Sequence, residues 1–117
     1  MNILILDDDK NVGDILKDLV ISMGNTAESF TTVEGAIHYF VNNKIDGAIV
    51  DYYLNDSNFN GSKFINFLNE KKKIPCMIVT GKVDTSDIEK NYECLIDKAF
   101  IMDRLGDCMK KMNDKNV

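Results

Sequence analysis

Four short apolar runs in this chain each end at polar residues that can take part in chemistry. They are 3–6 before Asp7 and Asp8, 48–50 before Asp51, 77–79 before Thr80, and 94–97 before Lys98. Apolar runs of this length, separated by stretches with helical spacing, are typical of parallel strands buried on both faces of a sheet. Ligands of such sheets bind beyond the carboxyl ends of the strands. The pattern therefore predicts one composite site that is acidic and contains one cation.

The segments between these runs have the spacing of amphipathic helices. Apolar residues recur at steps of three and four in 12–23, 33–41, 64–68 and 105–112. Gly24 follows the first of these segments as a stop signal, and Thr32 is placed to cap the second. A weaker strand is predicted at 27–30. With one further helix between the fourth and fifth strands, five strands alternate with five helices, which indicates an α/β domain with helices on both faces of the sheet.

Composition limits the classes of protein to consider. The chain has 117 residues, of which 44% are hydrophobic and 28% charged, as expected for one globular domain. No apolar run approaches the length of a membrane span, and no signal-peptide pattern precedes Asp7, so a cytoplasmic protein is expected. The net charge of −5 argues against direct nucleic-acid binding and favours protein partners.

The cysteines are odd in number and lack the paired spacing of a zinc site. Cys76 and Cys94 lie in or beside predicted strands. We therefore expect Cys76, Cys94 and Cys108 to be reduced thiols in the core.

The residues of the composite site suit phosphoryl chemistry. The Asp51 carboxylate can attack phosphorus and form a mixed anhydride. Asp7 and Asp8 crowd it with negative charge, which a hard divalent cation, Mg²⁺ or else Mn²⁺, would neutralise. Lys98 can pair with Asp51 at rest and with a phosphoryl oxygen afterwards, and the Thr80 hydroxyl can donate to another such oxygen. Asp9 is expected to serve at the start of the first helix, where acids favour the helix dipole, and not in the site.

Four motifs, ILILDDD, GAIVD, MIVTG and LIDKAF, stand in this order at the predicted strand ends. In this arrangement the chain resembles, over nearly its whole length, a receiver domain of bacterial two-component response regulators. The resemblance implies a three-layer flavodoxin-like fold, with a five-stranded parallel sheet in the order 2-1-3-4-5 and five helices. It also implies that Asp8, Asp51 and the backbone carbonyl of Tyr53 ligate Mg²⁺, while Asp7 acts mostly through water.

The sequence departs from the family pattern at several positions. Ala99 follows Lys98 where the family commonly has a proline after a cis bond, so this loop is expected to be either trans and rearranged or cis and strained. Leu95 stands where the family usually has an aromatic switch residue. Only 18 positions separate Thr80 from Lys98, so the fourth helix is expected to be short, starting at one of residues 84–86. The loop 52–61 is longer than usual, and it either influences the choice of partner or is an inert insertion.

The expected protein is a single receiver domain spanning 1–117, without an effector domain. It would accept a phosphoryl group on Asp51 from a histidine kinase or a histidine phosphotransfer protein, and would signal to a downstream protein target. It would not be an enzyme beyond its own phosphorylation and dephosphorylation, the latter at a rate set by Tyr53 and Lys82. A domain excised from a larger hybrid kinase would look much the same.

Two other classes remain open. A pseudo-receiver would keep the fold and bind partners constitutively. A phosphohydrolase of the haloacid-dehalogenase kind also has an Asp-x-Asp motif after its first strand. Asn11 stands where that motif has Thr or Val, and the chain is short for a substrate-binding cap.

Overall fold

The computed structural model describes residues 1–81 and 84–115. The strands are β1 (Asn2–Leu6), β2 (Thr26–Phe30), β3 (Gly47–Asp51), β4 (Cys76–Thr80) and β5 (Cys94–Asp97). The helices are α1 (Lys10–Ser22), α2 (Val33–Asn42), α3 (Gly61–Lys71) and α4 (Ile101–Lys115), with a 3-10 turn, η1 (Lys98–Phe100), before the last of them.

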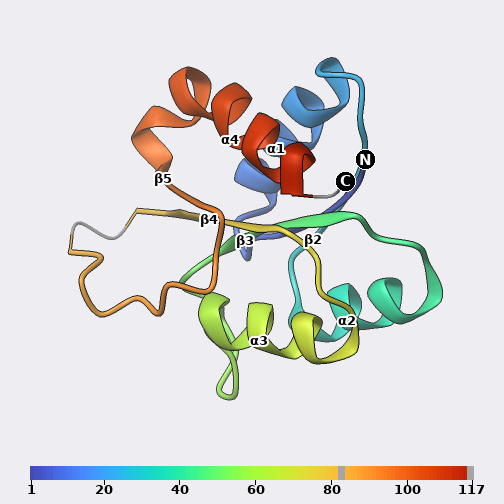
Figure 1. Cartoon of the computed structure of the whole chain (residues 1–117). Coiled ribbons are helices and arrows are strands. Elements are labelled where there is room, and N and C mark those ends of the chain that lie inside the picture. Colours follow the sequence, from blue (N-terminus) through green and yellow to red (C-terminus); the bar gives the residue numbers. More distant parts are fainter. Residues whose placement is uncertain (82–83, 116–117) are drawn as a thin grey trace.

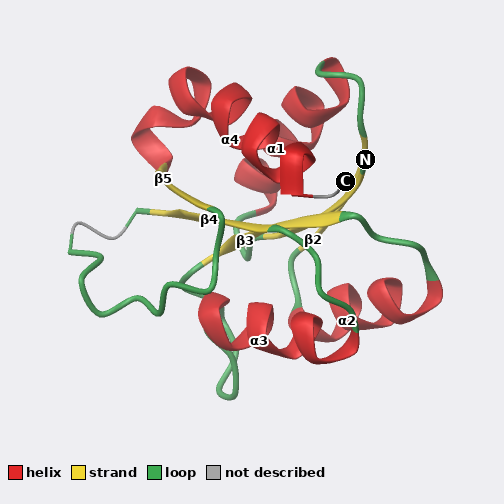
Figure 2. Cartoon of the chain, in the orientation of Figure 1, coloured by secondary structure: helices red, strands yellow, loops and turns green. Residues whose placement is uncertain are grey.

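The five strands form one parallel sheet in the order β2-β1-β3-β4-β5, as predicted. Helices α1 and α4 cover one face of this sheet, and α2 and α3 cover the other (Figure 1). The three layers are clearest when helices and strands are coloured separately (Figure 2). The flavodoxin-like fold expected from the sequence is therefore confirmed.

Each face of the sheet has its own hydrophobic core. Strand residues alternate between the two faces, so Ile3 and Ile5 pack with α1 and α4, whereas Leu4 and Leu6 pack with α2 and α3. All four of these side chains are at most 1% exposed. Burial on both faces explains why the central strands read as unbroken apolar runs.

The helix ends largely follow the local signals. Asp9 caps α1 by accepting hydrogen bonds from the backbone of Asn11 and Val12, which is the structural role predicted for it. Thr32 caps α2 as predicted. Gly24, the predicted stop signal, adopts a φ of 90° that favours glycine.

The prediction of a helix between the fourth and fifth strands is wrong for the residues that the structure describes. Residues 84–93 form turns and bends, and Val83 lies outside the described part. Within 84–93 only Ile88 is fully buried. One buried apolar side chain offers little packing energy to offset the cost of nucleating a short helix.

Hydrogen bonds to α3 hold this segment instead. The Asn91 amide donates to the Ser62 carbonyl and to Asn66 Oδ1, both at 2.8 Å. Asn66 in turn donates to Glu89 Oε2 at 2.9 Å. The connection from β4 to β5 is therefore attached to the same helix that follows the strand carrying Asp51.

The expectation of three reduced cysteines is wrong for two of them. Cys94 of β5 and Cys108 of α4 form a disulfide, with their Cα atoms 5.8 Å apart. Cys76 is free and buried, and burial, followed by the charge of Glu93, raises the pKa of its thiol to about 12. The sequence could not reveal the pair, because packing of α4 against the sheet brings these residues together.

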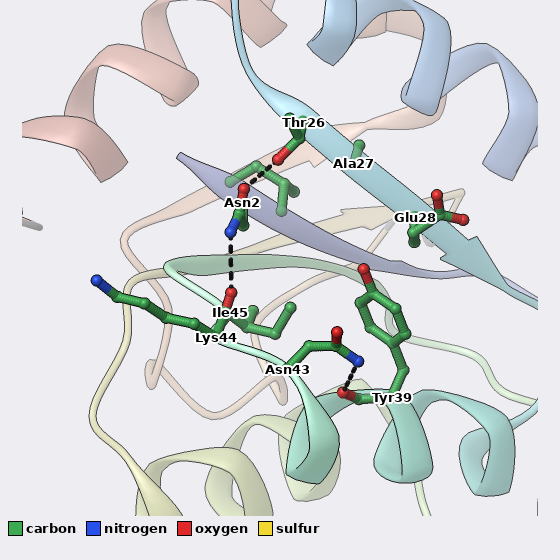
Figure 3. Close-up of a pocket in the computed structure, with 9 residues that line it drawn as sticks. Asn2, Thr26, Ala27, Glu28, Tyr39, Asn43, Lys44 and Ile45 are labelled. Carbon is green, nitrogen blue, oxygen red and sulfur yellow. Dashed lines mark hydrogen bonds between the residues drawn. The ribbon is translucent and has the colours of Figure 1, made fainter.

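A polar cavity of about 150 Å³ lies at the edge of the sheet where the strands begin, opposite their carboxyl ends (Figure 3). The Thr26 hydroxyl donates a hydrogen bond to the Asn2 side chain, which in turn donates to the Lys44 carbonyl. The Asn43 side chain donates to the Tyr39 carbonyl. These hydrogen bonds join the starts of β1 and β2 to the segment between α2 and β3. None of the helices in the described part of the chain is long and apolar enough to cross a membrane.

Candidate functional site

The carboxyl edge of the sheet gathers the residues that the sequence singled out. Asp7 follows β1 directly, Asp51 ends β3, Thr80 ends β4, and Lys98 follows β5. These four strands are neighbours in the sheet and all run in the same direction. Side chains separated by more than 40 positions in the sequence are thereby brought into contact.

Three acidic side chains form the centre of the site. Carboxylate oxygens of Asp7, Asp8 and Asp51 all lie within 4.8 Å of one another. Asp7 is 1% and Asp51 4% exposed, whereas Asp8 is open to solvent. The backbone N–H of Asp9 donates to Asp7 Oδ1 at 2.9 Å, which fixes the orientation of that carboxylate.

Lys98 supplies the positive charge. Its Nζ donates to Asp51 Oδ2 at 3.1 Å and lies 3.3 Å from Asp7 Oδ2, so one ammonium group links two acids from different strands. The Lys98 side chain is 27% exposed, which leaves it partly solvated while its partners are buried. Within the described residues, the site therefore combines three acidic side chains with the Lys98 ammonium group.

Burial shifts the protonation equilibria of the site. Loss of solvation, followed by the charge of Asp7, raises the pKa of Asp51 to about 6, although Lys98 opposes the shift. Loss of solvation also raises the pKa of Asp7, against the hydrogen bond from Asp9 and the charge of Lys98. For Lys98, burial alone lowers the pKa, but its contacts with Asp51 and Asp7 outweigh burial and leave the pKa above its ordinary value.

These acids fit a divalent cation. Oδ1 of Asp51 is buried and accepts no hydrogen bond within the described residues, while the buried Oδ2 of Asp7 faces the Lys98 ammonium at 3.3 Å. Buried carboxylate oxygens without donors are costly unless a cation compensates them. An all-oxygen set of three nearby carboxylates is the kind of site that Mg²⁺ occupies. Asp7, Asp8 and Asp51 are therefore the side chains that would hold it.

The remaining predicted residues lie around this centre. Thr80 is fully buried and stands opposite Asp97 in the sheet register. The Tyr53 side chain is 52% exposed and packs edge-on against the Tyr52 ring. Lys82 lies outside the described residues. Of the two alternatives for the Lys98–Ala99 bond, the structure has the trans form, because no described peptide bond is cis.

Sequence reasoning missed two residues beside the site. Gly61, the first residue of α3, lies against the backbone of Asp51, and a Cβ there would be 2.6 Å from the Asp51 carbonyl oxygen. Asp97 accepts a hydrogen bond from the Ala99 N–H at 2.8 Å and caps the turn that carries Lys98. The sequence does contain a signal for this turn, because an aspartate side chain commonly accepts a hydrogen bond from the backbone N–H two residues later.

Comparison with known proteins agrees with this architecture. Residues 3–105 match the family model of the response regulator receiver domain. No curated protein matches the chain. Among solved structures, TrrA, a response regulator protein from Thermotoga maritima in complex with Mg(2+)-BeF, is 24% identical, with a TM-score of 0.83 over 95% of this chain and 97% of that one.

Two further solved structures share the fold. A response regulator receiver domain protein from Clostridium thermocellum is 19% identical, with a TM-score of 0.83 over 97% of this chain and 95% of that one. A CheY-like receiver domain from Methylobacillus flagellatus is 18% identical, with a TM-score of 0.81 over 96% and 98%. At these identities the structures establish the fold alone, and the family model, which spans most of the chain, establishes that this protein belongs to the response regulator receiver domain family.

Proposed function

We propose that this chain is a single-domain response regulator that accepts a phosphoryl group on Asp51 in a Mg²⁺-dependent reaction. The donor would be the phosphohistidine of a histidine kinase or of a histidine phosphotransfer protein. The observation that carries the proposal is the position of Lys98 Nζ, 3.1 Å from the buried Asp51 carboxylate and 3.3 Å from that of Asp7. A cation between two buried acids at the carboxyl edge of a parallel sheet suits a reaction that brings in further negative charge.

Each residue of the site has a separate role in phosphoryl transfer. An oxygen of Asp51 forms a bond to phosphorus as the bond from phosphorus to the donor imidazole nitrogen breaks, and the nitrogen keeps the electron pair. The products are an acyl phosphate on Asp51 and a free imidazole. Lys98 moves its hydrogen bond from Asp51 to a phosphoryl oxygen, and the Thr80 hydroxyl donates to another. A bound Mg²⁺, held by Asp7, Asp8, Asp51 and the Tyr53 carbonyl, would neutralise charge on the phosphoryl group.

Signalling would depend on contacts that differ between the two phosphorylation states. Water later hydrolyses the acyl phosphate, and we propose that Tyr53 and Lys82 set the rate of this step, because each lies two positions beyond a residue of the site. We propose that the protein turns over no other substrate and acts as a switch, not as an enzyme for a metabolite. Its target would be another protein, and its place of action the cytoplasm.

The proposal is tested by intact-mass analysis after incubation with Mg²⁺ and phosphoramidate or acetyl phosphate. We expect the wild type to gain the mass of one phosphoryl group, and neither Asp51→Asn nor wild type in excess EDTA to gain it. Asp56→Asn, in the exposed loop after Tyr53, is the matched control and is expected to gain it normally. Uptake by Asp51→Asn would show that another residue is the acceptor.

A second candidate is a constitutive protein-binding module that keeps the fold without the switch. Two observations favour it, namely the aliphatic Leu95 in β5 and the turns in place of a helix in 84–93. NMR spectra with and without beryllofluoride and Mg²⁺ separate the candidates. Shifts that spread from the site into β5 and 84–93 support the switch, whereas an unchanged spectrum and no phosphoryl uptake support the binding module.

A further inference from the structure

The backbone that carries Lys98 is held by a side-chain hydrogen bond immediately beyond the sheet. Asp97 is the last residue of β5, and its pairing with Thr80 is the last in the register between β4 and β5. The next hydrogen bond along the chain runs from the Ala99 N–H to Asp97 Oδ1, at 2.8 Å. It closes a turn around Lys98, whose peptide bonds are trans.

The turn lies between the end of β5 and the start of α4, and it sets the direction in which the Lys98 side chain leaves the backbone. β5 lies at the edge of the sheet, and among the described residues it pairs with β4 alone, so no described strand supports it on the other side. The Lys98 side chain is flexible along its length, and its ammonium group must reach Asp51 and Asp7 at the ends of β3 and β1. A small rotation of the backbone at residues 97–99 would move that ammonium group by much more.

We propose that Asp97 is a positioning residue for Lys98. Its carboxylate oxygen holds the Ala99 N–H, and the resulting turn directs the Lys98 side chain across the sheet edge to the acids. The role belongs to the acceptor oxygen and not to the negative charge, since the contact that Asp97 makes is a hydrogen bond to a neutral backbone N–H. This inference rests on the proposed function, in which Lys98 stabilises the phosphoryl group.

Two variants of Asp97 separate the acceptor from the charge. Asp97→Asn keeps an acceptor oxygen and removes the charge, whereas Asp97→Ala removes both. We expect Asp97→Ala to lower the rate of phosphorylation by phosphoramidate about fivefold, the equivalent of one net hydrogen bond, and Asp97→Asn to stay within about twofold of wild type. Asp107→Ala, an exposed acid in α4, is the matched control for loss of charge and is expected to react normally.

A comparison of single and double variants tests whether the loss of rate in Asp97→Ala acts through Lys98. In a Lys98→Ala background, Asp97→Ala is expected to cause no further loss of rate, because the group that it positions is already absent. Equal losses in both backgrounds would show that Asp97 acts on the fold in general and would overturn the proposal. A loss with Asp97→Asn as large as that with Asp97→Ala would overturn the acceptor role.

A second measurement works whether or not the protein is phosphorylated. In protein labelled with ¹⁵N-lysine and ¹³C-lysine, the side-chain signal of Lys98 is identified by its absence in Lys98→Arg. We expect this signal to move toward that of a solvated lysine in Asp97→Ala and to stay in place in Asp97→Asn. An unmoved signal in Asp97→Ala would overturn the inference alone, whereas a wild type that takes up no phosphoryl group would overturn the proposed function alone.

Discussion

Gly61 lies against the carbonyl oxygen of Asp51, so closely that a Cβ on Gly61 would be 2.6 Å from that oxygen and 2.8 Å from the Tyr52 Cα. Both neighbours are backbone atoms that no side-chain rotation can move away. The Gly61 N–H also donates to the Tyr52 carbonyl at 2.7 Å. The start of α3 is therefore in direct contact with the peptide that holds the proposed phosphoacceptor.

We expect Gly61→Ala to disturb the site as well as the fold. The added methyl must push α3 away from β3, at a cost of about 1–3 kcal/mol in the free energy of unfolding. The same displacement moves Asp51 relative to Lys98 and should slow phosphoryl uptake several-fold. Urea unfolding and intact-mass kinetics measure the two effects.

Gly106→Ala is the matched control for this substitution. Gly106 lies within α4, and a Cβ there meets nothing within 4 Å. Alanine favours a helix interior over glycine by about 1 kcal/mol, so this variant should be more stable than wild type and react normally. If Gly61→Ala were also stabilising, the close approach at Asp51 would not be a real constraint.

Lys98→Ala should separate metal binding from phosphoryl transfer. Without its ammonium group the phosphoryl oxygens lose a charged donor, so the rate with phosphoramidate should fall at least tenfold. The acids then lack their only cationic partner among the described residues, so the affinity for Mg²⁺, measured by calorimetry, should rise. A fall in both quantities would indicate that Lys98 mainly maintains the fold of the site.

The stability of the metal-free protein should depend on pH through Asp51. Its pKa in the folded state, about 6, exceeds the ordinary value of 3.8, so folding disfavours the ionised form. The resulting penalty is absent below the unfolded pKa, grows as pH rises between the two values, and is complete above the folded pKa. With EDTA present, the free energy of unfolding should therefore fall over this range, on the order of 3 kcal/mol.

Comparison with Asp51→Asn isolates this contribution from that of other groups. Asparagine cannot ionise, so the free energy of unfolding of Asp51→Asn should fall less than that of wild type over the same pH range. Adding Mg²⁺ at neutral pH should stabilise the wild type more than the variant, because the cation compensates the ionised Asp51. Parallel pH profiles for the two proteins would contradict the assignment of the raised pKa to Asp51.

The disulfide between Cys94 and Cys108 should stabilise the protein when it is oxidised. It closes a sequence separation of 14 positions, for which loss of unfolded-state entropy predicts about 3 kcal/mol. A reductant should therefore lower the free energy of unfolding of wild type, and should leave that of the Cys94→Ser, Cys108→Ser double variant unchanged. Thiol titration of the unfolded, non-reduced protein should find one free cysteine, Cys76, and three reactive thiols would contradict the disulfide.

Features that depend on local interactions can be read from the amino-acid sequence. Buried strands require unbroken apolar runs, and polar residues can appear only where those runs end, so the positions of Asp7, Asp51, Thr80 and Lys98 in the chain are enough to mark the functional edge of the sheet. The caps at Asp9 and Thr32 depend on hydrogen bonds within three residues, so they too can be predicted from the sequence.

Features that depend on contacts between distant segments became visible only in the folded protein. Whether 84–93 forms a helix depended on how many of its side chains could be buried against α3, and the disulfide depended on where α4 packs. The approach of Gly61 to Asp51 likewise depends on how α3 packs against the end of β3. Periodicity and propensity describe one segment at a time, whereas these contacts are set by the order of the strands and by the packing of helices on the sheet.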